Sequence, residues 1–388
     1  MTETENRARA ILERLVAFPT VSRDSNLPLI DWVEDYLAGH GVTAHRVWNE
    51  DRTKAGLYAN VGPEVAGGVV LSGHSDVVPV DGQAWASDPW TLTERDGRLY
   101  GRGTCDMKGF VALALAAVPA ALEVGVRRPL QLAISYDEEL GCTGAPPLIA
   151  ALARALPPAA AVVVGEPSMM RPIEGHKGGM GFRLRLRGHE VHSSLLPEGV
   201  SAIHEAGRIL DWVNRTNAAL AAAAPSVAAE RFVPPFTTVH VGRIAGGTAQ
   251  NITAGGCELT LDIRAVPGEA LSVWEERVRA LADEVAAGMR AIHPDTGIEV
   301  ARIFHVPPLA PEPDGAAVSL VHALTGENGR GVVSYGTEGG QFQDAGYSAV
   351  ICGPGDIAQA HQPDEFVSVA QFRAGAAFID RLVAHLSA

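Results

Sequence analysis

Short apolar segments that alternate with helical segments constrain the fold of this chain more than any other feature. Strand-like runs at 69–72, 130–135 and 160–164 are largely apolar, and helical patterns at 110–122 and 146–156 separate them. Strands that are apolar on both faces are buried on both sides, and alternation with helices favours a parallel sheet. These segments therefore predict an α/β domain with a mostly parallel sheet.

The pattern changes near Gly178. Residues 180–188 alternate apolar and basic side chains, which is typical of an antiparallel strand with one wet face. The elements that follow, in the order β-α-β-β-α, resemble a ferredoxin-like unit that lacks one strand, which residues 297–304 can supply. The expected elements are a helix at 201–217, strands at 237–244 and 257–265, and a helix at 271–290.

From about residue 307 the α/β pattern returns, with a helix at 316–324, a strand at 349–352 and a last helix at 369–386. A chain of 388 residues is too long for one ordinary core. We therefore expect a first domain formed by 1–178 and 306–388, with a smaller α+β domain inserted at 179–305.

Composition excludes several classes of partner. Hydrophobic residues make up 47% and charged residues 20%, as in a folded globular protein, and the net charge of −14 argues against nucleic acid or an anionic membrane. The apolar run at 111–122 is too short to span a bilayer, and no apolar leader opens the chain. The four cysteines lack a Cys-X-X-Cys pair, which favours reduced thiols in a cytoplasmic protein.

Acids and histidines follow each buried strand of the predicted α/β domain. Because ligands of open α/β sheets gather outside the carboxyl ends of the strands, these side chains are expected to meet at one place. They are His74 and Asp76 after the first strand, Asp106 in a glycine-rich turn, Glu138 and Glu139 after the second strand, Glu166 after the third, and His361 after the last.

Two imidazoles and three carboxylates suit borderline divalent metals such as zinc, cobalt or manganese. They are too many for one catalytic zinc that keeps an open position, but they fit two ions if one carboxylate bridges. His74 and Asp76 point the same way along an extended segment, so Asp76 can hold the second ring nitrogen of His74.

Each of these residues also has an ordinary structural explanation. His74 alone reads as a surface histidine, Glu138 and Glu139 as a solvated acidic turn, and Asp106 as the N-cap of the following helix. Their joint placement at successive strand ends favours a metal site.

Four segments resemble the M20 family of zinc-dependent amidohydrolases and exopeptidases: SGHSDVVP (72–79), GRGTCDMKG (101–109), DEELGC (137–142) and GEP (165–167). GTEGGQF (336–342) and CGPGDIAQAHQPDE (352–365) are most similar to the acetylornithine deacetylases of that family. The resemblance spans nearly the whole chain. It implies a zinc-exopeptidase-like α/β catalytic domain and an inserted ferredoxin-like domain that serves as lid and dimerisation domain.

The resemblance also implies roles at a site with two divalent ions, zinc or alternatively cobalt. Asp106 would bridge the ions, His74 and Glu166 would complete one ligand set, and Glu139 and His361 the other. By the same resemblance, Glu138 is the general base and Asp76 orients His74.

Further residues are implied for the inserted domain and its surroundings. His192 would reach into the site of a partner subunit and stabilise the oxyanion, although His189 is an equal candidate from the sequence alone. Arg264 would bind the substrate carboxylate, with an ion pair to Asp262 as the alternative. The other substrate contacts implied or expected are Asn251, Gly336 and Lys177.

The resemblance implies a cytoplasmic homodimeric metal-dependent amide hydrolase that removes the acetyl group from N2-acetyl-L-ornithine in arginine biosynthesis. A succinyl-diaminopimelate desuccinylase or a broad N-acyl-amino-acid hydrolase of the same family is the alternative. A di-zinc aminopeptidase fits the ligands but usually lacks an inserted domain of this size. A non-catalytic binding protein is disfavoured, because all the ligands and the base are present.

Overall fold

The computed structural model describes residues 2–388, which divide into two compact units. The first unit contains the chain up to Gly175 together with Pro311–Val332 and Thr337–Ala388, and the second contains His176–Ala310 and Val333–Gly336. The boundaries expected after 178 and after 305 lie within a few residues of these transitions. No feature of the sequence indicated that residues 333–336 group with the second unit.

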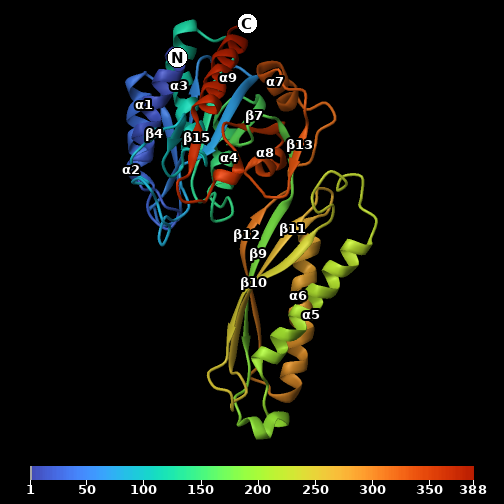
Figure 1. Cartoon of the computed structure of the whole chain (residues 1–388). Helices are drawn as coiled ribbons and strands as arrows, with labels where there is room; N and C mark the ends of the chain where they lie inside the picture. Colours follow the sequence, from blue (N-terminus) through green and yellow to red (C-terminus); the bar gives the residue numbers. More distant parts are fainter. Residues whose placement is uncertain (1) are drawn as a thin grey trace. The chain divides into compact units, whose positions relative to one another are not determined.

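An eight-stranded sheet forms the centre of the first unit, in the order β1-β2-β6-β3-β7-β14-β8-β13 (Figure 1). The inner strands β6, β3, β7 and β14 run parallel, whereas β1 and β2 add an antiparallel edge. This confirms the predicted α/β fold with a mostly parallel sheet. The strands are β1 Ala44–Trp48, β2 Ala55–Val61, β3 Gly68–His74, β6 Leu130–Ser135, β7 Ala159–Pro167, β8 Ile173–His176, β13 Gly331–Val333 and β14 Ala349–Gly353.

Helix α3 (Lys108–Val124) is the most deeply buried helix of this unit, because its sequence is apolar on nearly every face. Helices α1 (Glu3–Val16) and α9 (Val369–Ser387) pack against it. A Cβ at Gly165 of β7 would lie 1.9 Å from the Phe110 ring, so only glycine lets α3 approach the sheet there. The other helices are α2 Leu27–Gly39, α4 Ala145–Ala155, α7 Ala316–Thr325 and α8 Gly339–Asp344.

A small three-stranded sheet, β15-β5-β4, was not predicted from the sequence. It joins β4 (Thr93–Arg95), β5 (Arg98–Tyr100) and β15 (Phe366–Ser368). The antiparallel pairing of Phe366 with Tyr100 brings together the segments that carry Asp106 and His361. Strands of three residues are too short to show a period, which explains why the pattern did not indicate them.

The second unit is a four-stranded antiparallel sheet, β10-β11-β9-β12, with two helices. Every second residue of β11 is buried, as expected for a sheet with one covered face. Strand β12 is the one predicted at 297–304, so the order is β-α-β-β-α-β. The elements are β9 Gly178–Arg187, η1 Ser193–Glu198, α5 Ala202–Ala222, β10 Thr238–Gly246, β11 Gly256–Ala265, α6 Leu271–Ile292 and β12 Gly297–Val306.

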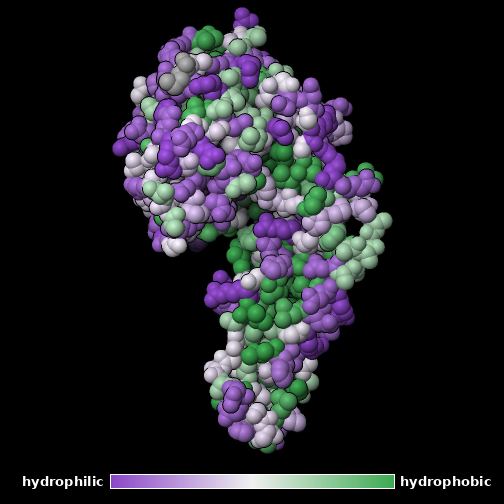
Figure 2. Space-filling view, in the orientation of Figure 1, coloured by the Kyte–Doolittle hydropathy of each residue, from purple (hydrophilic) through white to green (hydrophobic). Residues whose placement is uncertain are grey.

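The surface of the second unit includes exposed apolar side chains (Figure 2). Val227 and Val233, in the loop between α5 and β10, are 85% and 84% exposed. Within residues 2–388, no helix is both long enough and apolar enough to cross a membrane.

Candidate metal centre

The predicted metal ligands converge in the first unit, at the carboxyl ends of its parallel strands. His74 is the last residue of β3, and Glu166 lies near the end of β7. Glu139 follows β6, Asp106 precedes α3, and His361 lies in the loop after β14. Parallel strands place these ends at one edge of the sheet, as the sequence pattern predicted.

Asp106 lies between the two histidines. Its Oδ1 is 3.1 Å from Nε2 of His74, and its Oδ2 is 3.2 Å from Nε2 of His361. Glu166 Oε1 lies 3.7 Å from Nε2 of His74, and Glu139 Oε2 lies 3.0 Å from Nε2 of His361. The five residues therefore form two sets of three that share one carboxylate.

Asp76 contacts His74 differently from the sequence-based expectation. Nδ1 of His74 contacts the backbone carbonyl of Asp76 at 2.8 Å, while the Asp76 carboxylate is 3.5 Å away. The carboxylate accepts hydrogen bonds from Oγ of Ser22 at 2.6 Å and from the backbone N–H groups of Glu138 and Glu139 at 3.2 and 3.4 Å. Asp76 therefore contacts both the His74 ring and the turn that carries Glu138 and Glu139.

The ordinary structural explanations for three of these residues are wrong. The His74 side chain is fully buried, so it is not a surface histidine, and the Glu139 side chain is only 8% exposed. Helix α3 begins at Lys108 with Met107 as its N-cap, and no side chain caps it. Asp106 therefore does not serve as an N-cap.

The buried acids repel one another. Burial and then the neighbouring Asp106 raise the pKa of Glu139, and the same two causes hold the pKa of Glu166 well above its usual range. Burial favours protonated Asp106, but hydrogen bonds to His361 and His74 outweigh it and lower the pKa of Asp106. A donor set of carboxylates and imidazoles with this repulsion fits divalent cations, which would replace protons as the balancing charge.

The two histidines carry part of that balancing charge in the metal-free chain. Burial alone would lower the pKa of His74, but Asp106 and Asp76 hold it well above the ordinary value. Hydrogen bonds to Asp106 and Glu139 raise the pKa of the half-exposed His361 to about 10. Metal binding at both sets would therefore compete with protons on the imidazoles.

Glu138 lies at the same centre, with ligand atoms of His74, Glu138 and Glu166 all within 4.8 Å of one another. Burial, reinforced by Glu139, raises its pKa to about 8. The thiol of Cys142 donates to its Oε1 at 3.2 Å. Proximity alone would allow Glu138 to be a ligand, whereas a raised pKa suits proton transfer.

Two buried glutamates near the centre were not picked out from the sequence. Glu338, 1% exposed, accepts hydrogen bonds from Ser72 of β3 at 3.1 Å and from Ser135 of β6. Glu365, also 1% exposed, contacts the segment that carries Asp106. Both lie in the segments 336–342 and 352–365, but a glutamate in a polar loop carries no sign that folding will bury it.

His192 and Asn251 lie side by side in the second unit. A β-bridge pairs His192 with Ile252, and the backbone N–H of Ser193 donates to the carbonyl of Asn251 at 2.8 Å. Both residues are exposed. His189, the equal candidate from the sequence, stacks instead on His293 with ring centroids 3.6 Å apart.

The other predicted substrate residues make contacts inside the second unit. Arg264 forms the alternative ion pair, with Nε and Nη2 each 2.9 Å from a carboxylate oxygen of Asp262. The buried Lys177 ammonium donates to the carbonyls of Pro234 and Phe236 at 2.8 and 2.7 Å. Gly336 lies beside Val306, whose Cγ1 would be 3.2 Å from a Cβ at that position.

The chain matches known proteins over nearly its full length. It is 38% identical to an acetylornithine deacetylase of Myxococcus xanthus, covering 99% of both chains. An M20 family metallo-carboxypeptidase of Sulfolobus solfataricus has the same fold, with a TM-score of 0.79, 18% identity and 100% of both chains covered. A dinuclear metal binding peptidase of the M20 family from Bacillus subtilis has a TM-score of 0.66 and 14% identity, covering 99% of this chain and 98% of that one.

Residues 70–385 match the family model for peptidase family M20/M25/M40. This range contains every residue of the candidate metal centre, and it covers the second unit as well. The M20 resemblance in the sequence is therefore confirmed, and the chain belongs to peptidase family M20/M25/M40.

Proposed function

We propose that this enzyme hydrolyses the amide bond of N2-acetyl-L-ornithine to give L-ornithine and acetate, a reaction of arginine biosynthesis. The observation that carries the proposal is the 38% identity to an acetylornithine deacetylase over 99% of the chain. The converging acids and histidines support the chemistry, because amide hydrolysis needs both an activated water and a stabilised oxyanion.

Two divalent ions, zinc first and cobalt second, are the proposed cofactors. His74 and Glu166 would hold one ion, Glu139 and His361 the other, and Asp106 would bridge them. Ions bound there supply Lewis-acid stabilisation of the acyl oxygen and increase the acidity of the attacking water. The support is the shared position of Asp106, which faces one imidazole with each of its oxygens.

Glu138 would serve as the general base and then as the general acid. In the metal-free chain its pKa is raised to about 8, mainly by burial, and nearby cations would lower that value toward neutral pH. With a pKa near neutral pH, the Glu138 carboxylate can take a proton from the attacking water and return it to the leaving amine. Asp76 would keep Glu138 in place through its backbone N–H.

The second unit would supply the substrate contacts. We propose that His192 enters the site of the partner in a cytoplasmic homodimer and donates to the oxyanion, as an exposed imidazole can. Asn251 and Arg264 would bind the substrate carboxylate, with Nη1 of Arg264 available because Nε and Nη2 already contact Asp262. Gly336 would allow close approach of the substrate, and Lys177 would act indirectly, by holding the loop at 234–236.

A substrate panel tests the proposal. The metal-free protein is reloaded with zinc or cobalt and supplied with N2-acetyl-L-ornithine, N-acetyl-L-methionine, N-succinyl-L,L-diaminopimelate and a dipeptide with a free amino group. We expect the highest kcat/KM for N2-acetyl-L-ornithine, with acetate and ornithine released in equal amounts. A higher kcat/KM for the succinylated substrate, or equal values for several acyl amino acids, would favour the family alternatives instead.

A further inference from the structure

Glu365 has an unusually complete set of hydrogen bonds for a buried carboxylate. Its Oε1 accepts from the backbone N–H groups of Cys105 and Asp106, both at 2.9 Å. Its Oε2 accepts from the backbone N–H of Gly103 at 2.9 Å and from Nη1 of Arg102 at 2.7 Å. Each oxygen therefore faces two donors, and the loop that carries Asp106 is wrapped around one side chain.

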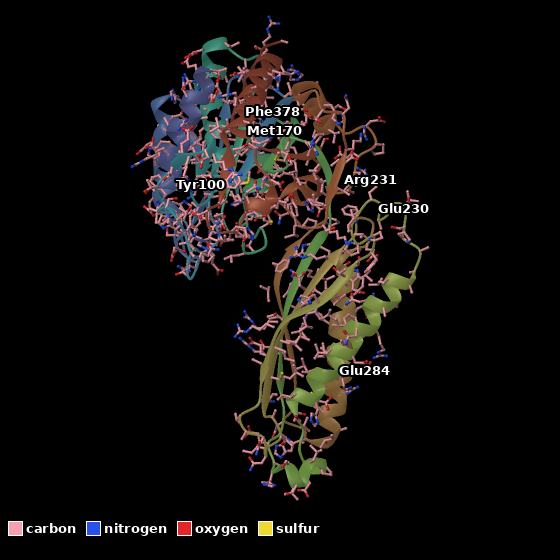
Figure 3. The ribbon with its side chains drawn as sticks, viewed as in Figure 1. Tyr100, Met170, Glu230, Arg231, Glu284 and Phe378 are labelled. Atoms are coloured by element: carbon pink, nitrogen blue, oxygen red, sulfur yellow. The ribbon has the colours of Figure 1, made fainter. Side chains whose placement is uncertain are left out.

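The backbone of Glu365 holds the same loop. Its carbonyl accepts from the N–H of Gly101 at 3.0 Å. Gly101 directly follows Tyr100, which is the last residue of β5 and is labelled in Figure 3. The next residue, Phe366, pairs with Tyr100 in the small sheet. The segment from His361 to Glu365 is thus joined to the loop at 101–106 by both side-chain and main-chain contacts.

Arg102 extends this connection back to His361. Its Nη2 donates to Oε1 of Gln83 at 2.6 Å, and Nε2 of Gln83 donates to the backbone carbonyl of His361 at 2.9 Å. The guanidinium also lies over the Trp85 ring, 5.1 Å from its centroid. A continuous chain of hydrogen bonds therefore runs from the backbone at Asp106, through Glu365, Arg102 and Gln83, to the backbone at His361.

A buried ion pair of this kind is costly unless its geometry is well satisfied. Arg102 and Glu365 have side chains that are 1% exposed, and removing two such charges from water opposes folding. The four donors on Glu365 offset part of that cost, because charge-assisted hydrogen bonds are the strong ones. What the arrangement achieves locally is a fixed spacing between two candidate metal ligands.

We propose that Glu365 is a positioning residue for the metal set formed by Asp106, Glu139 and His361. This positioning role rests on the two-ion site of the proposed function. Glu365 does not touch the ligand atoms of this set. It bonds the main chain at Asp106 directly and is linked to the main chain at His361 through Arg102 and Gln83, so Asp106 and His361 keep the spacing that one ion requires. The other ion shares Asp106, but its other two ligands, His74 and Glu166, are held by β3 and β7, so it depends less on Glu365.

The substitution Glu365→Gln tests this directly. Each oxygen of Glu365 faces two donors, so the amide NH₂ of glutamine meets two N–H groups in either orientation. We expect the ion at Asp106, Glu139 and His361 to bind about 10- to 100-fold more weakly, as for other outer contacts of metal ligands. The ion at His74, Asp106 and Glu166 should lose less affinity, because two of its three ligands are held by β3 and β7.

Stepwise titration of the metal-free protein with Co²⁺ measures both affinities, by calorimetry and by the visible absorption of each bound ion. The matched control is Glu5→Gln, because Glu5 is a buried glutamate of the same unit, on α1, whose partner at 3.3 Å is Arg373 on α9 rather than a residue of the metal sets. The control should lower the urea midpoint without changing either Co²⁺ affinity. Equal weakening of both ions in Glu365→Gln, or none, would overturn the proposal.

Gln83→Ala provides a second variant, which leaves Glu365 and its four hydrogen bonds in place. It removes the connection between Arg102 and His361, so we expect the same ion to be weakened, by less than in Glu365→Gln. If Glu365→Gln does not fold and Gln83→Ala binds both ions normally, the positioning role is rejected. A wild-type protein that binds fewer than two ions would instead reject the two-ion site, and with it this part of the proposed function.

Discussion

The two units of this molecule differ in how their predicted functional residues are held. In the first unit, His74, Asp106 and His361 come from distant segments and meet within hydrogen-bonding distance. In the second unit, His192 is exposed, and Arg264 forms an ion pair with Asp262, two residues before it in the sequence. One unit presents an assembled centre, and the other presents separate groups that already have local contacts.

This difference has a physical origin. Parallel strands bring their carboxyl ends together in any α/β sheet, so acids placed there meet once the sheet forms. The candidate groups of the second unit lie on a loop and on the polar face of an antiparallel sheet, where they acquire a role only when a substrate or a partner chain meets them. Variants in the two units should therefore fail in different ways.

The largest effect is expected at the assembled centre. Glu138→Gln removes the group that would transfer the proton, and we expect kcat to fall by about 10²- to 10⁴-fold. The ion content should stay at the wild-type value, because Glu138 is not among the proposed ligands. Steady-state kinetics together with elemental analysis of the same sample measure both quantities.

Glu139→Gln is the matched control for that substitution, since it changes the adjacent glutamate in the same turn. It should lose one ion per chain, and added metal should restore part of its activity. If Glu138→Gln loses an ion while Glu139→Gln keeps both, the roles of the two glutamates have to be exchanged.

The ligand set of the first unit could be predicted because four of its five members, His74, Glu139, Glu166 and His361, follow segments with a clear strand pattern, and Asp106 lies in a glycine-rich turn before a clear helix. The sequence did not indicate Glu338 or Glu365, since their burial depends on contacts made only in the folded chain. It did not indicate that the backbone carbonyl of Asp76 lies closer to Nδ1 of His74 than the Asp76 carboxylate does.

In the second unit the sequence placed the elements well but could not rank the polar residues. His189 and His192 are equal candidates in the sequence, and they are distinguished only in the structure, where the His189 ring stacks on His293. Lys177 was expected to contact substrate, yet its ammonium binds two backbone carbonyls. Side-chain partners of this kind are set by tertiary structure and leave no mark on local periodicity.

His192→Gln tests whether the second unit takes part in the chemical step. If His192 donates to the oxyanion, kcat should fall by about 10²- to 10³-fold, with a smaller change in KM. His189→Gln is the control, and it should leave kcat near the wild-type value. The reverse result, a large loss for His189 and none for His192, would show that the stacked histidine had been misassigned.

Mixing two inactive variants sharpens this test. His192→Gln and Glu138→Gln, combined before assay, can form a dimer that carries one intact composite site if His192 acts across subunits. We expect activity to appear on mixing. Mixtures that stay inactive despite subunit exchange would argue that His192 acts within its own chain.

A smaller effect is expected for Arg264→Lys. Lysine keeps the charge but not the planar pair of donors, so we expect KM for N2-acetyl-L-ornithine to rise about tenfold, or about 1.4 kcal/mol, with kcat little changed. N-acetylputrescine, which lacks the carboxylate, should be hydrolysed with the same kcat/KM by both proteins. An equal loss on the two substrates would mean that Arg264 supports the fold through Asp262 rather than binding the carboxylate.

The last effect concerns the stability of the metal-free protein as the pH changes, and solvent screening of the half-exposed His361 reduces it. Hydrogen bonds to Asp106 and Glu139 raise the pKa of His361 to about 10, whereas an unfolded histidine titrates near 6.5. Between these values the folded chain binds one more proton than the unfolded chain, so stability falls as the pH rises. The contribution of His361 is complete below about pH 6.5 and is lost as the pH rises through about 10.

The difference between wild type and His361→Asn isolates this contribution. Burial lowers the pKa of Lys108 to about 7, which adds a slope of opposite sign over an overlapping range, and that slope is common to both proteins. Urea midpoints of the metal-free proteins at pH 6.5, 8 and 9.5 should therefore converge as the pH rises. Zinc should remove the convergence, because a bound ion takes the place of the proton between His361 and the acids; a gap that stays constant with pH would mean that His361 is not charged in the folded chain.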